Sequence, residues 1–92
     1  MKPVDEATIR EMVSRLAAEF SPEAIILFGS RAWGAPDEES DVDLLVVVSE
    51  SEARPVHRVL RARRCLRGIP VPKDVIVRTS AEVRKLAAVP AS

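Results

Sequence analysis

A chain of 92 residues with 47% hydrophobic and 30% charged side chains has the composition of a globular protein, which argues against intrinsic disorder. Fourteen Lys and Arg residues balance fourteen Asp and Glu residues, so bulk charge gives no reason to expect direct nucleic-acid binding. The length fits one domain over residues 1–92 with a thin core, to which a partner chain, metal or ligand is expected to add stability.

Cysteine usage and apolar runs bear on the compartment. The single cysteine, Cys65, cannot form an internal disulfide and fits a reducing environment. Asp5 and Glu6 stand where a secretory signal needs an apolar stretch, and no apolar run reaches the ~20 residues that cross a bilayer. We therefore expect a cytoplasmic protein without a membrane partner.

A helix and two strands are predicted for the first half of the chain. Apolar residues recur at helical spacing over residues 5–20, which predicts an amphipathic helix that stops at Ser21-Pro22. The apolar run from Ala24 to Phe28 ends at Gly29 and predicts a buried strand. Residues 41–48 begin polar and become fully apolar, which is typical of a central strand covered on both faces.

The second half of the chain predicts a helix, a strand and a short helix, at Glu52 to Arg67, Asp74 to Val77 and Thr79 to about Ala87. Pro55 falls in the first turn of the long helix, where its missing N–H is harmless. Thr79 and Glu82 have the spacing of a capping box. The whole order predicts an α/β (α+β) fold, with a small mixed sheet of three or more strands and helices packed on it.

Two carboxylates begin the second predicted strand. Because side chains alternate along a strand, Asp41 and Asp43 should point to the same face, where they cannot be buried as an uncompensated pair. Mg²⁺ is the natural bridge, since it prefers hard oxygen ligands and phosphate oxygens. Asp74 begins another strand, and it could reach the same cluster if the two strands are neighbours. Three carboxylates around two metals would suit in-line nucleotidyl transfer.

A glycine-serine turn follows the first predicted strand. Gly29 allows the backbone to turn sharply and to approach a ligand closely. The residues after it could present free N–H groups to a phosphate, and the Ser30 hydroxyl could add a hydrogen bond. Arg31 could neutralise phosphate charge, although a structural pairing with the acidic residues 37–39 is almost equally expected.

Together these residues resemble a known signature. Gly29-Ser30, ten intervening residues and Asp41-Val42-Asp43 are similar to the motif of the DNA polymerase β-like nucleotidyltransferase superfamily. The strings GSRAWG (29–34) and SDVDLLV (40–46) resemble its minimal nucleotidyltransferase (MNT) branch, and the likeness extends from the first helix through residues 73–77. Trp33 is a departure, because relatives often carry another arginine at this position.

The resemblance implies roles for the matching residues. Gly29, Ser30 and Arg31 would bind the nucleotide, Asp41 and Asp43 would ligate two Mg²⁺ ions, and Asp74 would complete the catalytic metal site. By the same analogy Asp74 could help to deprotonate an attacking hydroxyl. The implied reaction uses ATP, transfers AMP and releases pyrophosphate.

The resemblance also implies two alternative functions. In the minimal branch, such proteins are often antitoxins that add AMP to a tyrosine of a small all-helical HEPN-type toxin. The short chain fits a large external acceptor better than a small substrate with a domain of its own. The alternative is a non-catalytic subunit that neutralises a HEPN partner by complex formation alone, and nothing in the sequence excludes it.

The other candidate residues are better explained by structural roles than by functional ones. Trp33 could stack on a base, but packing against a nearby helix is more often the role of a loop aromatic. The arginines of the second long helix are spread around it without interleaved aromatics, so a solvated or partner-facing surface is expected. His57 is expected to be exposed, and Cys65 to be a half-buried helix residue.

Overall fold

The computed structural model describes residues 6–28, 42–51 and 53–87, in which the predicted order of elements is confirmed. The elements are α1 (Glu6–Phe20), β1 (Ala24–Phe28), β2 (Val42–Val48), α2 (Pro55–Cys65), β3 (Lys73–Thr79) and α3 (Ser80–Ala87). The sequence predictions for Gly29, Ser30, Arg31, Trp33 and Asp41 lie outside the described residues. No described helix is long and apolar enough to span a bilayer.

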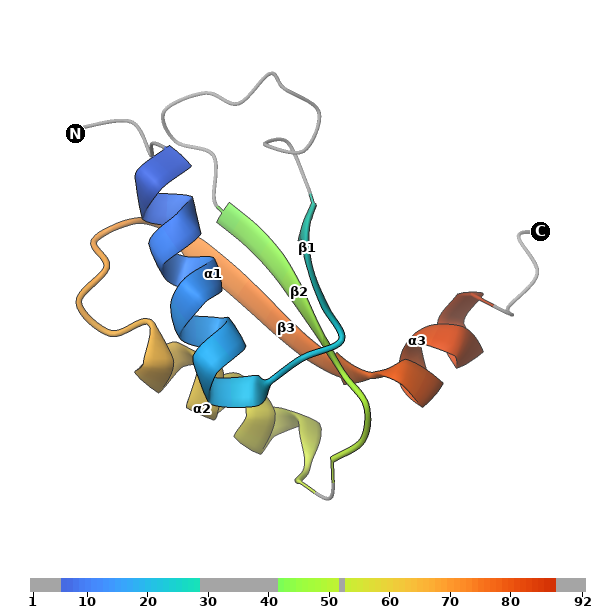
Figure 1. Cartoon of the computed structure of the whole chain (residues 1–92). Helices are drawn as coiled ribbons and strands as arrows, with labels where there is room; N and C mark the ends of the chain where they lie inside the picture. Colours follow the sequence, from blue (N-terminus) through green and yellow to red (C-terminus); the bar gives the residue numbers. More distant parts are fainter. Residues whose placement is uncertain (1–5, 29–41, 52, 88–92) are drawn as a thin grey trace.

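The described strands form one mixed sheet in the order β1-β2-β3. β1 pairs with β2 antiparallel and β2 pairs with β3 parallel, which confirms the predicted mixed sheet. The parallel pair is connected through α2, because parallel neighbours need a crossover connection. β2 is therefore central, and α1 and α2 lie together on one side of the sheet (Figure 1).

The covered face of the sheet contains the hydrophobic core. Alternate residues of β2 point to this face, and Val42, Leu44 and Val46 are at most 1% exposed. Met12 and Leu16 of α1 are fully buried against the same cluster. The remaining buried members of the cluster are Val48, Ala62, Leu66, Ile69, Val75 and Val77. An aliphatic core of this kind follows from the low aromatic content of the chain.

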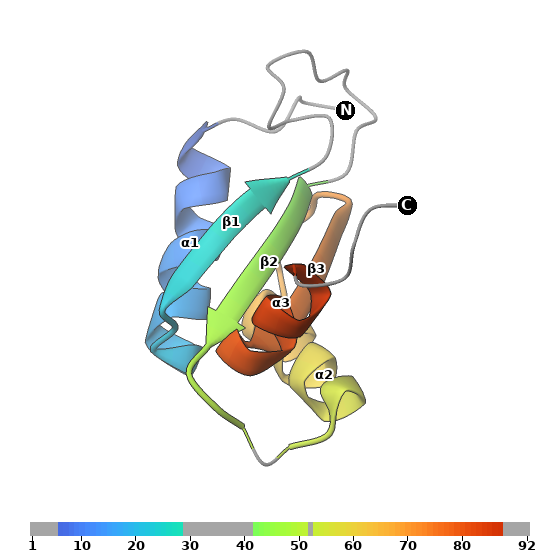
Figure 2. The same ribbon diagram turned by 90° about the vertical axis from the view of Figure 1, so that its right-hand side faces the viewer.

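The described helices cover the opposite face of the sheet only in part (Figure 2). In Figure 2, α3 lies in front of this face while α1 and α2 lie behind the sheet. The prediction that β2 is covered on both faces is therefore wrong for its first half: Asp43 and Leu45 are only half-buried, whereas Val47 is buried. The sequence pattern could not reveal this difference, because a continuous apolar strand has the same pattern whether one or two layers cover it.

α2 is shorter than the predicted range of 52–67, since it begins at Pro55 and ends at Cys65. Arg54 has extended backbone angles (φ −65°, ψ 148°), because a proline disfavours the helical conformation in the residue before it. After the helix the chain turns at Gly68, whose φ of 91° is a left-handed conformation that glycine adopts without a steric penalty.

β3 is longer than the predicted Asp74–Val77. Its pairing with β2 continues to Val48 and Thr79. Polar residues such as Arg78 and Thr79 therefore belong to the strand because they pair with β2, not because of an apolar sequence pattern. Thr79 thus ends β3 and also caps α3.

The predicted capping box is confirmed at the start of α3. The Thr79 backbone N–H donates to Glu82 Oε1 (2.7 Å), and the Glu82 backbone N–H donates to Thr79 Oγ1 (3.1 Å). Arg58 of α2 donates to the same Glu82 oxygen at 2.7 Å. The Thr79 N–H and then the Arg58 guanidinium lower the pKa of Glu82 from its usual 4.5 to about 2. The capping carboxylate therefore connects α2, β3 and α3.

Truncation in the core tests the packing. We expect Leu16→Ala to lower the free energy of unfolding by about 2–5 kcal/mol, because it leaves a cavity in a fully buried site. Leu86→Ala serves as the control, since Leu86 is 66% exposed and its truncation should change stability by about 0.5 kcal/mol or less. Urea unfolding followed by circular dichroism measures both, and equal effects would contradict the assignment of the core.

The pH dependence of folding tests the Glu82 cluster. A carboxylate whose folded-state pKa is lowered stabilises the fold above its unfolded pKa, so this contribution is present above about pH 4.5 and is lost as the pH falls towards 2. We expect Glu82→Gln to be less stable than the wild type at pH 7, with the difference shrinking between pH 4.5 and 2.

Thermal unfolding of the two proteins across this pH range measures the difference. Glu23→Gln is the control, because Glu23 is exposed and forms no ion pair within the described part of the chain. A constant gap between wild type and Glu82→Gln down to pH 2 would contradict the lowered pKa.

Candidate functional site

Two of the three predicted acidic residues lie side by side. Asp43 and Asp74 occupy the second positions of β2 and β3, and they face each other directly in the parallel register. The next pair, Leu44 and Val75, is buried in the core beneath α1 and α2. Because side chains alternate along a strand, Asp43 and Asp74 must both point to the opposite, partly open face.

The same row of the sheet continues into β1. Phe28 is the register partner of Asp43 on its other side, so the three residues Phe28, Asp43 and Asp74 cross the sheet in a line. Phe28 is also the last described residue before Gly29-Ser30, and Val42 is the first one after Asp41. Phe28 and Val42 flank the segment that contains the predicted phosphate-binding turn. Both residues therefore lie at the end of the sheet that carries this row.

The electrostatics of the row favour a bound cation. Neighbouring strands are about 4.8 Å apart, so two carboxylates in direct register repel each other unless a proton, solvent or a cation compensates their charge. Asp43 is half-buried and Asp74 is exposed, which gives a site that is accessible but not fully solvated. Their oxygens are the hard donors that Mg²⁺ prefers, so the residues present fit a divalent metal.

The third predicted ligand is not among the described residues. Within residues 6–28, 42–51 and 53–87, no group of three or more His, Cys, Asp or Glu side chains forms a candidate metal site. Asp41, the remaining member of the predicted set, lies outside these residues. The metal-binding role of the three aspartates therefore stays a prediction, with the position of two of them established.

A groove opens on the same face, one row further along the strands. Leu45 of β2 and Ile76 of β3 are register partners that form its floor. The cavity measures about 300 Å³. Its lining residues come from all three strands and from α3: Phe28, Leu45, Ile76, Arg78, Val83 and Leu86. We call this cavity the α3 groove, and its place in the fold could not be seen from the sequence.

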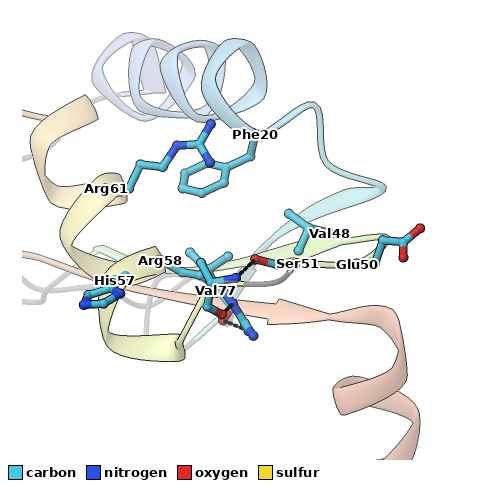
Figure 3. A pocket seen from close by; sticks show the side chains of 9 residues that line it. Phe20, Val48, Glu50, Ser51, His57, Arg58, Arg61 and Val77 are labelled. Carbon is cyan, nitrogen blue, oxygen red and sulfur yellow. Dashed lines mark hydrogen bonds between the residues drawn. The ribbon is translucent and has the colours of Figure 1, made fainter.

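A second hollow, of about 200 Å³, contains more charged groups but lies at the other end of β2, beside Val48 (Figure 3). Its cations are engaged in structural contacts. Arg58 donates to the carbonyl oxygens of Ala53 and Val77 and to Glu82, while Arg61 donates to Glu19 and lies 4.8 Å from the centre of the Phe20 ring. This hollow is far along β2 from Asp43, and its polar groups hold the fold together.

Arg58 corrects a sequence prediction. The arginines of this segment were expected on a solvated or partner-facing surface, which holds for Arg54, Arg63, Arg64 and Arg67, whereas Arg58 is only 7% exposed and is paired with Glu82. Its spacing from Ala62 and Leu66 places it on the inward stripe of the helix, and this spacing was the available signal.

The expectations for the other two residues of this segment are confirmed. His57 is exposed and Cys65 is half-buried. Burial and then the nearby charge of Glu19 raise the pKa of the Cys65 thiol, so the residue is a poor nucleophile.

Comparisons with known proteins agree with this geometry. Residues 9–89 match the family described as the nucleotidyltransferase domain. This chain belongs to that family. Among solved structures, the fold is similar to the crystal structure of a "putative nucleotidyltransferase" from Sulfolobus solfataricus. The match has a TM-score of 0.69 and 31% sequence identity, and it covers 86% of this chain and 70% of the other. Among curated proteins, none matches this chain.

Family membership establishes the general chemistry. Nucleotidyltransferase domains transfer a nucleotidyl group from a nucleoside triphosphate with the help of a divalent metal, so the chain is assigned to the transferases. The paired carboxylates at the edge of the partly open face are the described feature that suits this chemistry.

Metal-dependent stability tests the carboxylate pair. We expect Mg²⁺ or Mn²⁺ to raise the melting temperature of the wild type, because a ligand that binds only the folded state stabilises it by about 2.7 kcal/mol at 100 times its Kd. Asp74→Asn should lose most of this gain, and in EDTA it should be as stable as the wild type or more so, since one repelling charge is gone.

Glu50→Gln is the matched control, because Glu50 is an exposed carboxylate without an ion pair to any described residue. Differential scanning fluorimetry with and without EDTA measures the shifts. An Asp74→Asn protein that keeps the full metal-dependent shift would show that Asp74 is not a ligand.

Proposed function

We propose that this nucleotidyltransferase uses Mg-ATP to transfer AMP to a hydroxyl group, that of a tyrosine on a HEPN-type partner protein, and thereby acts as an antitoxin. The observation that carries the proposal is the direct register of Asp43 and Asp74 on the partly open face of the sheet. A protein that acted only as a scaffold would have no physical need to place two like charges side by side.

The proposed chemistry assigns a role to each acidic residue. Asp41, Asp43 and Asp74 would hold two Mg²⁺ ions, which would neutralise charge that develops on the transferred phosphoryl group. The acceptor oxygen forms a bond to the α-phosphorus of ATP, and the bond from that phosphorus to the pyrophosphate oxygen breaks. The proton of the acceptor hydroxyl passes to the Asp74 carboxylate, which is exposed and therefore accessible to the acceptor.

The open face supports a macromolecular acceptor. Only α3 lies over this side of the described sheet, whereas α1 and α2 both lie on the other side (Figure 2). A hydroxyl on the surface of another protein could therefore approach the Asp43–Asp74 row without entering a deep pocket. An enclosed pocket would suit a small acceptor better, since such sites bury most of their ligand.

A second candidate function has one observation in its favour. α2 exposes two apolar side chains, Val56 at 58% and Leu60 at 45%, on a helix that also carries exposed arginines. Such a surface suits contact with a partner protein. It is compatible with a subunit that neutralises a HEPN partner by binding alone, as well as with an enzyme that first docks to its acceptor.

One assay separates the two functions. The protein is incubated with Mg-ATP and the product of the adjacent reading frame, and the intact mass of that product is measured. We expect one or more AMP units to be added, at a rate that falls at least about 100-fold in Asp43→Asn and Asp74→Asn, because each removes charge stabilisation from the transition state.

Glu50→Gln is again the control and should keep the wild-type rate. An unmodified partner in a tight, inhibitory complex, unaffected by either Asn variant, would instead establish the binding function. Repeating the incubation with GTP, CTP and UTP tests the choice of ATP.

A further inference from the structure

The α3 groove lies at a defined distance from the carboxylate row. Its floor residues, Leu45 and Ile76, follow Asp43 and Asp74 by two positions on the same face of the sheet. Each residue advances a strand by about 3.3 Å, so the floor lies about 6.6 Å from the acidic row along the strands. This distance is close to the length of one phenol ring with its hydroxyl and its methylene.

The far end of the groove is cationic. A further hollow shares Arg78 and Leu86 with the groove and adds Glu82 and Lys85. The charge of Glu82 is compensated, since its carboxylate accepts from Arg58 and from the Thr79 backbone. Among the described residues, the Arg78 side chain donates only to the Val77 carbonyl, and neither Arg78 nor Lys85 forms an ion pair. The two cations are available to an anionic group.

We propose that the α3 groove is the acceptor-recognition site and that it takes a tyrosine flanked by acidic residues. The aromatic ring lies over Leu45 and Ile76 with its hydroxyl directed towards the Asp43–Asp74 row, and a neighbouring carboxylate of the acceptor pairs with Arg78 and Lys85. The inference rests on the proposed function and adds the residues that select the acceptor.

The chemistry of the lining favours a phenol ring over a nucleobase. Leu45, Ile76, Val83 and Leu86 offer no side-chain donors or acceptors, and Arg78 offers donors at one end of the groove only. The donor groups of a base and most of its polar edge would therefore lose hydrogen bonds to water without replacement. A tyrosine has an apolar ring and a single polar group at its tip. A serine or threonine on the same backbone path would be too short to span the distance to the acidic row.

The charge complementarity is tested with synthetic peptides that carry one tyrosine between glutamates or between lysines. Transfer from Mg-ATP is measured for the wild type, for the double variant Arg78→Glu/Lys85→Glu, and for Arg84→Glu. Arg84 is an exposed cation of α3 that lines neither hollow, so Arg84→Glu controls for a charge reversal on α3 outside the groove.

We expect the double variant to raise the KM of the glutamate peptide about fivefold or more, because it replaces two attractive charges by two repulsive ones, and to favour the lysine peptide instead. The KM of ATP should stay within about twofold in all three proteins, since the nucleotide does not occupy the groove. Arg84→Glu should behave as the wild type.

A binding measurement keeps the inference independent of catalysis. Two labelled peptides are used: the glutamate peptide and the same peptide with phenylalanine in place of tyrosine. The binding of each peptide to the wild type and to Leu86→Asp is measured by fluorescence anisotropy. We expect Leu86→Asp to weaken binding of both peptides, because it places a charge against the ring, and circular dichroism checks that this exposed site leaves the fold intact.

The outcomes distinguish the two proposals. Peptide binding that follows the charge swap without any AMP transfer would contradict the proposed function and support the groove as a peptide-binding site. Transfer to a HEPN-type partner that is unaffected by Leu86→Asp and by the charge swap would overturn the groove inference alone. A raised KM of ATP in these variants would assign the groove to the nucleobase and would also overturn it.

Discussion

The parallel register of β2 and β3 is the constraint on which the site depends. Residues of β2 and β3 alternate between a face sealed by α1 and α2 and a face that is partly open. A slip by one residue would move Val75 and Val77 from the covered face to the open face. Burial of Val42, Leu44 and Val75 therefore forces Asp43 and Asp74 into adjacent positions on the other side. Packing of the core thus holds the two carboxylates next to each other.

The position of α3 depends on a second set of polar contacts at the opposite end of the sheet. Thr79 ends β3 and begins α3, so strand and helix share one residue whose hydroxyl and N–H are both used by Glu82. Arg58 reaches the same carboxylate from α2 on the covered side. These contacts determine where Val83 and Leu86 can lie, and hence the width of the groove over Leu45 and Ile76. The ion pair between Arg58 and Glu82 thus helps to shape the α3 groove.

The two faces and the two ends of the sheet carry different features. The covered face supplies stability through aliphatic packing, and the hollow beside Val48 is filled with arginine contacts that connect the helices. The open face carries the carboxylates and the groove.

The sequence by itself determined the order of the elements, the mixed-sheet fold class and the family, because helical periodicity, the capping box and the spacing of Gly29-Ser30 from Asp41 and Asp43 are local features. Local patterns also predicted β1 and the bounds of α1 almost to the residue. They misplaced the ends of α2, where Pro55 imposes extended geometry on its predecessor.

Only the tertiary structure decided that β2 and β3 are neighbours, that Asp74 faces Asp43, and that Arg58 is buried. It also revealed that, among the described helices, α1 and α2 cover only one face of the first half of β2 (Figure 2), and that Asp43 is half-buried and Asp74 exposed. These features depend on strand pairing and on contacts between segments far apart in the chain, such as Arg58 and Glu82. The physical reason is that the sequence pattern of a helix or strand defines which of its residues share a face. Which other element packs against that face depends on the packing of the whole chain.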